Sequence, residues 1–257
     1  MAITGTDRGT AYISTNATTG TFSPASNFAA GSWAVCCIAL NNSNTNGSAY
    51  SIFTVTDSLG NTWTRRISPL NDPALVNAGV EGAIFTTSMD GGTLTTGTTI
   101  TITTNVATTR RCVTLMEIVP DSGYTIGYVT GASSTYTGIA PSITTGSITS
   151  GNIVIASMMN EYGEDLIVTQ DGDTINGTWS TQQTATSTGD ATATGLSIFS
   201  QRKIVTATAT QTYNPTMGDS NDMCLGWIEL NQSAGGGAGL IGKSFTRSFA
   251  LRRASQY

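Results

Sequence analysis

Apolar residues along this chain occur in short runs and alternating segments that are separated by turn-forming residues. The run Trp33-Ala-Val-Cys-Cys-Ile-Ala-Leu40 is apolar throughout, and the segment Thr98-Thr-Ile-Thr-Ile-Thr-Thr104 alternates between Thr and Ile. The first pattern predicts a buried central strand, and the second predicts a strand with one face in the core. Because no segment combines a 3.6-residue period with helix caps, we expect very little helix.

The segment 57–64, Asp-Ser-Leu-Gly-Asn-Thr-Trp-Thr, has the composition of a tight turn that leads into a strand. Asp57 can accept hydrogen bonds from its own turn, and Gly60 and Asn61 tolerate a positive φ. Trp63 is a strand former that alternates with its neighbours. We therefore interpret Asp57 as a turn former and not as a catalytic acid.

The pattern of the first half of the chain recurs in the second half. Four segments have a later counterpart, namely 31–38 with 151–158, 57–64 with 173–180, 82–86 with 196–200, and 112–118 with 224–230. The matches occur in the same order, and their offsets fall from 120 through 116 and 114 to 112. Small loop deletions in the second copy would produce this drift. The sequence therefore indicates an internal duplication with pseudo-repeats at about 31–119 and 151–230.

The predicted strands are too few in each copy to form a stable sheet alone, so we expect the copies to share one core. The fold prediction is all-β, a jelly-roll or lectin-like two-sheet β-sandwich over residues 1–233. One short edge strand is expected within residues 1–30, and connecting strands are expected within 124–150. Two tandem immunoglobulin-like sandwiches that divide near 121–150 are the alternative.

Charge and composition exclude several classes of function. Of the 257 residues, 11% are charged, the net charge is −5, and His is absent. An acidic, Lys-poor chain is a poor nucleic-acid binder. Without His there is no Ser-His-Asp or Cys-His catalytic site and no imidazole metal site. The start of the sequence lacks a secretory signal, and no apolar run approaches the ~18 residues of a membrane span, so we expect assembly in a cytosol without a membrane partner.

The four cysteines, Cys36, Cys37, Cys112 and Cys224, lie in apolar surroundings. Adjacent residues on a strand face opposite sides, so Cys36 and Cys37 are not expected to pair with each other. We predict buried free thiols.

The acidic residues give no site with a recognisable ligand spacing. They form three small groups, at Glu161, Glu164 and Asp165, at Asp171 and Asp173, and at Asp219 and Asp222. None has the spacing of an EF-hand loop, and we interpret them as polar turns. No catalytic residue, metal or cofactor is predicted, so we expect a protein that is not an enzyme. A hydrolase with a carboxylate pair is the weakest alternative.

Glu117 and Glu229 lie within apolar strands at equivalent places in the two copies. We expect them to form structural ion pairs with Arg65, Arg66, Arg110 or Arg111, or to face solvent. The tryptophans Trp63, Trp179 and Trp227 are expected in the core.

The last segment, 234–257, differs in kind from the rest. A Gly-rich linker at 235–239 precedes a stretch with four cations and no acid. Alternate positions form one apolar and basic side, and the predicted partner-binding residues are Lys243, Phe245, Arg247, Phe249, Leu251, Arg252 and Arg253. A strand with one side to bury suits addition to the sheet of a neighbouring subunit, so we predict an extended C-terminal arm. A disordered basic tail is the alternative.

The Gly31 run, the turn Val55-Thr-Asp-Ser-Leu-Gly-Asn-Thr-Trp63 and the closing strand 224–230 carry a resemblance. Over about residues 20–231, the chain resembles phage and bacterial β-sandwich proteins that have a "G-N-L-L-V-V" strand and a "V-x-D-S-x-G-N-T-[YW]" turn. The resemblance implies a jelly-roll-like sandwich in a virion structural protein or a surface adhesin, with no catalytic residues.

From this resemblance we expect a phage structural protein, first of all a capsid decoration (cement) protein located in the virion. Its partners would be capsid or tail proteins of the same particle, and it would form a homo-oligomer such as a trimer. The alternative is a tail- or fibre-associated module that binds a host-surface glycan through Tyr and Asn residues in loops 41–50, 124–136 and 160–165.

Overall fold

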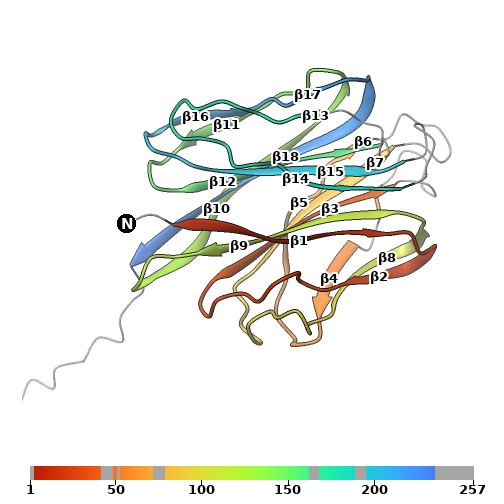
Figure 1. Cartoon of the computed structure of the whole chain (residues 1–257), viewed down its shortest axis with the longest axis horizontal. Helices are drawn as coiled ribbons and strands as arrows, with labels where there is room; N and C mark the ends of the chain where they lie inside the picture. The colour runs from red at the N-terminus through yellow and green to blue at the C-terminus, as the bar shows by residue number, and fades with distance from the viewer. Residues whose placement is uncertain are drawn as a thin grey trace, which may run out of the picture.

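The described part of the chain consists of antiparallel β-strands and contains no helix (Figure 1). The computed structural model describes residues 3–41, 49–50, 53–71, 79–161, 168–188 and 195–234. The prediction of an all-β chain is confirmed. The strands are β1 Thr4–Ile13, β2 Ala17–Phe22, β3 Trp33–Asn41, β4 Phe53–Asp57, β5 Thr64–Ile67, β6 Leu70–Asn71, β7 Val80–Thr87, β8 Ile100–Thr108, β9 Arg111–Val119, β10 Tyr124–Gly138, β11 Ile143–Ile148, β12 Ile153–Asn160, β13 Val168–Thr169, β14 Gln183–Thr186, β15 Ser197–Ile204, β16 Ala209–Tyr213, β17 Thr216–Met217 and β18 Asn221–Ala234.

These strands form five sheets that are stacked in layers (Figure 1). The first inner sheet has the order β1-β9-β3-β7-β5, with β6 also paired to β7, and the second inner sheet has the order β10-β18-β12-β15-β14. The two inner sheets lie face to face, with β7 against β18 and β9 against β15. The small sheet β2-β8-β4 covers the outer face of the first inner sheet, and the pairs β11-β16 and β13-β17 cover that of the second.

The expected sandwich of two sheets is therefore replaced by a stack of layers, and strand β3 shows the physical reason. Its side chains are buried on both faces, with Val35 and Cys37 in the core between the inner sheets and Cys36 and Ile38 in the core under the outer sheet. A sheet that is apolar on both faces needs a covering layer on each side. The same arrangement confirms that the adjacent thiols of Cys36 and Cys37 point to opposite faces.

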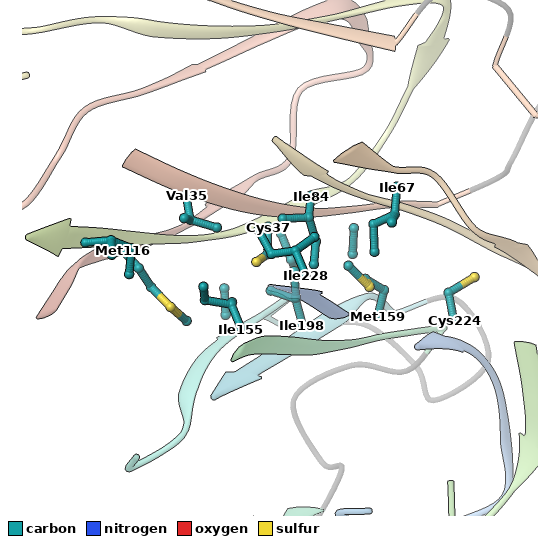
Figure 2. Close-up of a cluster of buried hydrophobic side chains, with 14 of the residues drawn as sticks. Val35, Cys37, Ile67, Ile84, Met116, Ile155, Met159, Ile198, Cys224 and Ile228 are labelled. Carbon is teal, nitrogen blue, oxygen red and sulfur yellow. The ribbon is translucent and has the colours of Figure 1, made fainter. Parts of the chain in front are cut away.

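The core between the inner sheets holds aliphatic and sulfur-containing side chains from both halves of the chain (Figure 2). Val35, Ile84 and Met116 of the first inner sheet face Ile155 and Ile228 of the second, and all five are fully buried. Burial of each such side chain contributes about 1.5–3 kcal/mol, so this core is a large part of what holds the halves together.

Two glycines permit the close approach of the inner sheets. A Cβ atom on Gly226 would lie 2.1 Å from Cδ1 of Ile67, and one on Gly82 would lie 2.9 Å from Cγ and Sδ of Met159. Each glycine belongs to one inner sheet and each contacting side chain to the other. The sheets therefore interlock at these points because no side chain is present there.

The N-terminal strands and the segment 124–136 differ from what the sequence predicted. The first 30 residues hold two strands, and β1 is ten residues long and forms a sheet edge, so the expected single short strand is wrong. The segment 124–136 lies within the long strand β10 and is not a loop. Residues 235–257 lie outside the described part, so the division into a domain at 1–233 and an arm at 234–257 stays a prediction.

Candidate functional site

The turn at 57–63, which we name the Asp57 corner, is held by one carboxylate. Oδ1 of Asp57 accepts hydrogen bonds from the backbone N–H groups of Leu59 (2.9 Å) and Asn61 (3.2 Å). Oδ2 accepts from Nδ2 of Asn61 (3.0 Å) and from Nε1 of Trp63 (2.7 Å). This pattern confirms Asp57 as a turn former, because its carboxylate is occupied by its own turn.

The turn at 90–92, which connects β7 to β8, packs against the Asp57 corner from outside. Oδ1 of the buried Asn61 accepts from the N–H groups of Gly91 (2.7 Å) and Gly92 (3.0 Å), and the backbone N–H of Thr62 donates to Asp90 (2.9 Å). A Cβ atom on Gly91 would lie 2.6 Å from the carbonyl oxygen of Leu59. The two turns are thus in direct backbone contact.

The equivalent turn at 173–179, the Asp173 corner, is built differently. Oδ1 of Asp173 accepts from the N–H of Ile175 (2.8 Å), but Oδ2 accepts from Nζ of Lys203 (2.8 Å), which belongs to β15. The Lys203 side chain is fully buried, and its Nζ lies 5.5 Å from the centre of the Trp179 ring. Burial favours the neutral form of Asp173, but the hydrogen bonds from Lys203 and Ile175 outweigh it and lower the pKa of this carboxyl group.

The indole of Trp179 is turned away from the Asp173 carboxylate. Its Nε1 donates to the carbonyl oxygen of Thr212 on β16 (3.2 Å), whereas the indole of Trp63 donates to Asp57. Trp179 and Trp227 are buried, as predicted, and Trp63 is half-buried against the core of the first half. The different direction of Trp179 joins the Asp173 corner to the edge of an outer sheet.

A polar groove lies between the Asp173 corner and strand β16. Its volume is about 440 Å³, and it is lined by Asp173, Ile175, Asn176, Thr210, Gln211, Thr212 and Asn214. The buried Asp171 supports its floor, because its carboxylate accepts from the backbone N–H groups of Asp173 (2.8 Å) and Asn214 (2.9 Å). The sequence placed Asp171 and Asp173 together as a polar turn but gave no sign of the groove, because β16 is separated from that turn by more than thirty residues.

Glu117 and Glu229 are both buried, and neither is paired with the arginines that we expected. Glu117 binds Arg8, whose Nε lies 2.8 Å from Oε2, and also accepts from Oγ of Ser32 (2.8 Å) and the N–H of Ala29. Arg8 lies in the bulge of β1 between Asp7 and Gly9, next to Glu117 in the sheet. This position depends on the pairing of β1 with β9, so the strand sequence alone could not identify the partner.

Glu229 accepts from Nδ2 of Asn152 (2.5 Å) and from the N–H of Thr149 (3.4 Å). Arg111, one of the expected partners, is buried and donates to the carbonyl oxygens of Thr15, Thr108 and Ala17. Both glutamates therefore fix loops to strands, which is a structural task.

Sequence reasoning missed Glu81, a fully buried carboxyl group on β7. It accepts from the N–H of Tyr50 (2.7 Å) and from Oγ of Ser68 (3.3 Å). Burial raises the pKa of Glu81 from 4.5 to about 7, because these hydrogen bonds compensate only part of the lost hydration. The only sign of this buried carboxyl group in the sequence was that Glu81 directly precedes an apolar run.

The remaining candidates for a chemical site are the cysteines, which are buried, and the acidic groups, which do not cluster among the described residues. The four thiols are free and buried as predicted, and burial raises the pKa of Cys36 well above its usual value and that of Cys37 to about 11, so neither forms a thiolate nucleophile near neutrality. Within the described ranges, no three acidic or thiol side chains gather in a way that could hold a metal ion. Oε2 of Glu161 accepts from the N–H of Gly79 (2.6 Å), and Glu164 and Asp165 lie outside the described residues.

The predicted arm residues Lys243, Phe245, Arg247, Phe249, Leu251, Arg252 and Arg253 lie outside the described residues. A search of the described chain for a helix that is long and apolar enough to cross a membrane finds none. No protein-family model, curated protein or solved structure matches this chain.

Proposed function

We propose that this protein is a non-enzymatic structural component of a phage particle, located in the virion, and foremost a capsid decoration (cement) protein. The observation that carries the proposal is that the carboxylates and thiols most suited to catalysis are occupied by hydrogen bonds within the protein or are buried. The Asp57 carboxylate is occupied by its own turn, Glu117 and Glu229 fix loops, and the thiols are buried. These features support a scaffold whose surface binds neighbours, as the resemblance at residues 55–63 implies.

We infer that the scaffold is an internal duplication of a jelly-roll-like unit. In each inner sheet the first strand of the half pairs with the last, the last pairs with a long central strand, and two further strands follow, as in β1-β9-β3-β7-β5 and β10-β18-β12-β15-β14. Two halves with the same order of hydrogen-bonded strands are what two copies of one unit would give.

Equivalent hydrogen bonds in the two halves support the duplication. Glu117 accepts from Ser32 Oγ and the N–H of Ala29, and Glu229 accepts from Asn152 Nδ2 and the N–H of Thr149. The glutamates are 112 residues apart and their partners 120 apart, as in the sequence matches. The register agrees as well, because Trp33 pairs with Ile118 and Ile153 pairs with Leu230 at the same two offsets.

The packing of the inner sheets supports a pseudo-two-fold relation between the halves. Strand β1 lies against β14 and β10 lies against β5, while β9 lies against β15 and β18 lies against β7. Exchanging the halves converts each contact of a pair into the other. We therefore infer that the chain resembles a symmetric dimer joined into one polypeptide, with a self-complementary interface at its centre.

In this proposal the C-terminal arm provides attachment to the particle. Phe245, Phe249 and Leu251 would be buried against a sheet of a neighbouring subunit, and Lys243 and Arg247 would contact acidic groups at its rim. The subunit would form a homo-oligomer, such as a trimer, and would be added to the particle in the host cytoplasm.

The proposal is tested on particles of the phage whose genome encodes the chain. Mass spectrometry of purified virions should detect the protein, and electron cryomicroscopy should show Phe245 and Phe249 buried against another chain. Deletion of 235–257 should abolish incorporation while the thermal unfolding of the remaining protein is unchanged.

A pair of variants makes the arm test specific. Phe245→Ser with Phe249→Ser should prevent incorporation, whereas the neighbouring changes Ser244→Ala with Ser248→Ala, on the other side of the arm, should not. Normal incorporation of the chain without 235–257 would refute the role of the arm. Absence of the protein from virions would refute the assignment to the particle.

A second candidate function is that of a tail- or fibre-associated module that binds a glycan. The polar groove beside the Asp173 corner favours it, although the groove is not at the predicted loops. The segment 124–136 is a strand, and residues 42–48 and 162–167 lie outside the described residues.

A further inference from the structure

We propose that the groove between the Asp173 corner and strand β16 binds a neutral saccharide. The proposal rests on the charge, the hydrogen-bonding groups and the shape of the groove. It rests on the glycan-binding candidate above, to which it gives a site and a class of ligand, and it does not depend on the place of the protein in a particle. Strands β11 and β16 form the outermost layer of the second half, so the groove lies away from the central interface (Figure 1).

The acidic groups at the groove are already compensated within the protein. Asp173 is paired with the buried Lys203, and the carboxylate of Asp171 accepts from two backbone N–H groups. A cationic ligand would have to compete with Lys203 for Asp173, and an anionic ligand would meet the two carboxylates. The lining therefore favours a ligand without charge.

The other polar groups of the lining suit a ligand that both donates and accepts hydrogen bonds. Asn176, Thr210, Thr212 and Asn214 carry amide or hydroxyl groups that can act in either sense. Thr210 and Asn214 are exposed, and Gln211 between them is buried and fixed, with its N–H donating to Oγ1 of Thr145 (2.8 Å). A row of such groups on a rigid strand edge matches the hydroxyl groups of a sugar.

One apolar side chain completes the groove. Ile175 has 71% of its surface exposed, more than any other large apolar residue among those described. A sugar ring has an apolar face of C–H groups, and an aliphatic side chain at the lip of a polar groove can pack against it. The volume of about 440 Å³ falls within the range of roughly 300–1,000 Å³ of small-molecule sites.

The first half offers a natural control, because its equivalent corner is closed. Asn61 and the turn at 90–92 occupy the space beside the Asp57 corner. Leu59, the counterpart of Ile175 at an offset of 116, is 39% exposed. A change at Leu59 therefore alters a matched apolar turn residue without altering the groove.

The test uses the full-length protein and an array of neutral, sialylated and sulfated oligosaccharides. The strongest array ligand is then titrated as the free oligosaccharide by NMR or calorimetry. We expect neutral oligosaccharides to bind, with affinity that is lowered at least tenfold by Ile175→Ser and by Asn214→Ala. Leu59→Ser should change the affinity less than twofold. Thermal unfolding should be nearly unchanged in all three variants, since each altered side chain is exposed.

Three results would overturn the proposal. They are the absence of binding to any neutral oligosaccharide, binding restricted to the sialylated or sulfated ones, and binding that Ile175→Ser and Asn214→Ala both leave intact. None of them bears on incorporation into virions, so the two proposals fail separately.

Discussion

The Asp57 and Asp173 corners begin from similar sequences and differ in what reaches the carboxylate. At the first corner the partners are local, since Leu59, Asn61 and Trp63 all lie within six residues of Asp57. At the second corner a buried lysine thirty residues away takes one carboxylate oxygen. The turn motif therefore keeps a similar backbone path in both places, but the chemistry of its acidic group differs.

The Gly and Asn residues of the two turns also have similar backbone conformations but different side-chain contacts. Gly60 and Asn176 occupy equivalent positions and both have a positive φ, of 78° and 57°. The next residue is Asn61 in one corner, where its side chain binds the turn at 90–92, and Gly177 in the other. The first corner thus contacts its neighbouring turn through the Asn61 side chain, whereas the second corner brings its backbone against the segment after β15, where the N–H of Thr206 donates to the carbonyl oxygen of Asn176.

The largest expected effect comes from giving the second corner the residue of the first. In Gly177→Asn, the new Cβ would lie 2.1 Å from the carbonyl oxygen of Ile204, at a φ of +120° that side chains rarely adopt. We expect the free energy of unfolding to fall by about 3 kcal/mol or more, as measured by denaturant unfolding.

The reverse change is the control for this prediction. At Gly60 the φ is +78° and no atom lies within 4 Å of an added Cβ, so Gly60→Asn should cost less than about 1 kcal/mol. Equal losses at Gly60 and Gly177 would contradict the structural difference between the corners.

The next effect concerns the buried ion pair of the second corner. Asp173→Ala leaves Lys203 buried without its carboxylate, and because Asp173 is itself 31% exposed we expect a loss of roughly 2–3 kcal/mol. The pKa of Asp173 is lowered in the folded protein, so this contribution is complete above the unfolded pKa and is lost as the pH falls. Urea unfolding at neutral and at acidic pH measures both effects.

A second change should separate the pair from the turn. Lys203→Met replaces the buried ammonium group with an apolar side chain of similar length. Combined with Asp173→Ala, it should restore most of the lost stability because no buried charge remains. A double variant as unstable as Asp173→Ala alone would show that the turn, and not the ion pair, sets the stability.

The smallest of these effects is a pH dependence of the free energy of unfolding that arises in the first half only. Glu81 belongs to the first half and pairs with Leu40, and the corresponding place in the second half, paired with Asn160, holds Ser197, which does not titrate. Because its folded pKa of about 7 exceeds the unfolded value of 4.5, the folded state holds the proton more tightly, and stability should fall as the pH rises between these values. The expected loss from about pH 5 to about pH 8 is of order 1–3 kcal/mol.

Glu81→Gln should remove this dependence, so that the variant matches the natural protein near pH 5 and is more stable near pH 8. Denaturant unfolding across this pH range measures it. A pH dependence that persists in the variant would assign the effect to another group.

The proposed duplication could be inferred from the sequence because the matched segments are local patterns, whereas the layers were only partly predicted. The segment 33–40 is apolar at every position, and this already requires cover on both faces of its sheet. A sheet that contains such a strand needs a covering layer on each face. The predicted two-sheet sandwich covered only one face of each sheet. The candidate groove could not be foreseen, since its lining combines 173–176 with 210–214.

The strand type, the positions of the main strands, the burial of the thiols and the turn-forming role of Asp57 could be predicted, because each depends on residues close together along the chain. Which distant group meets each buried charge depends instead on how the strands pair and stack. Arg8 reaches Glu117 through the pairing of β1 with β9, and Lys203 reaches Asp173 from β15. Such partners depend on register and sheet stacking, which are fixed by the summed burial of many side chains and not by any local pattern.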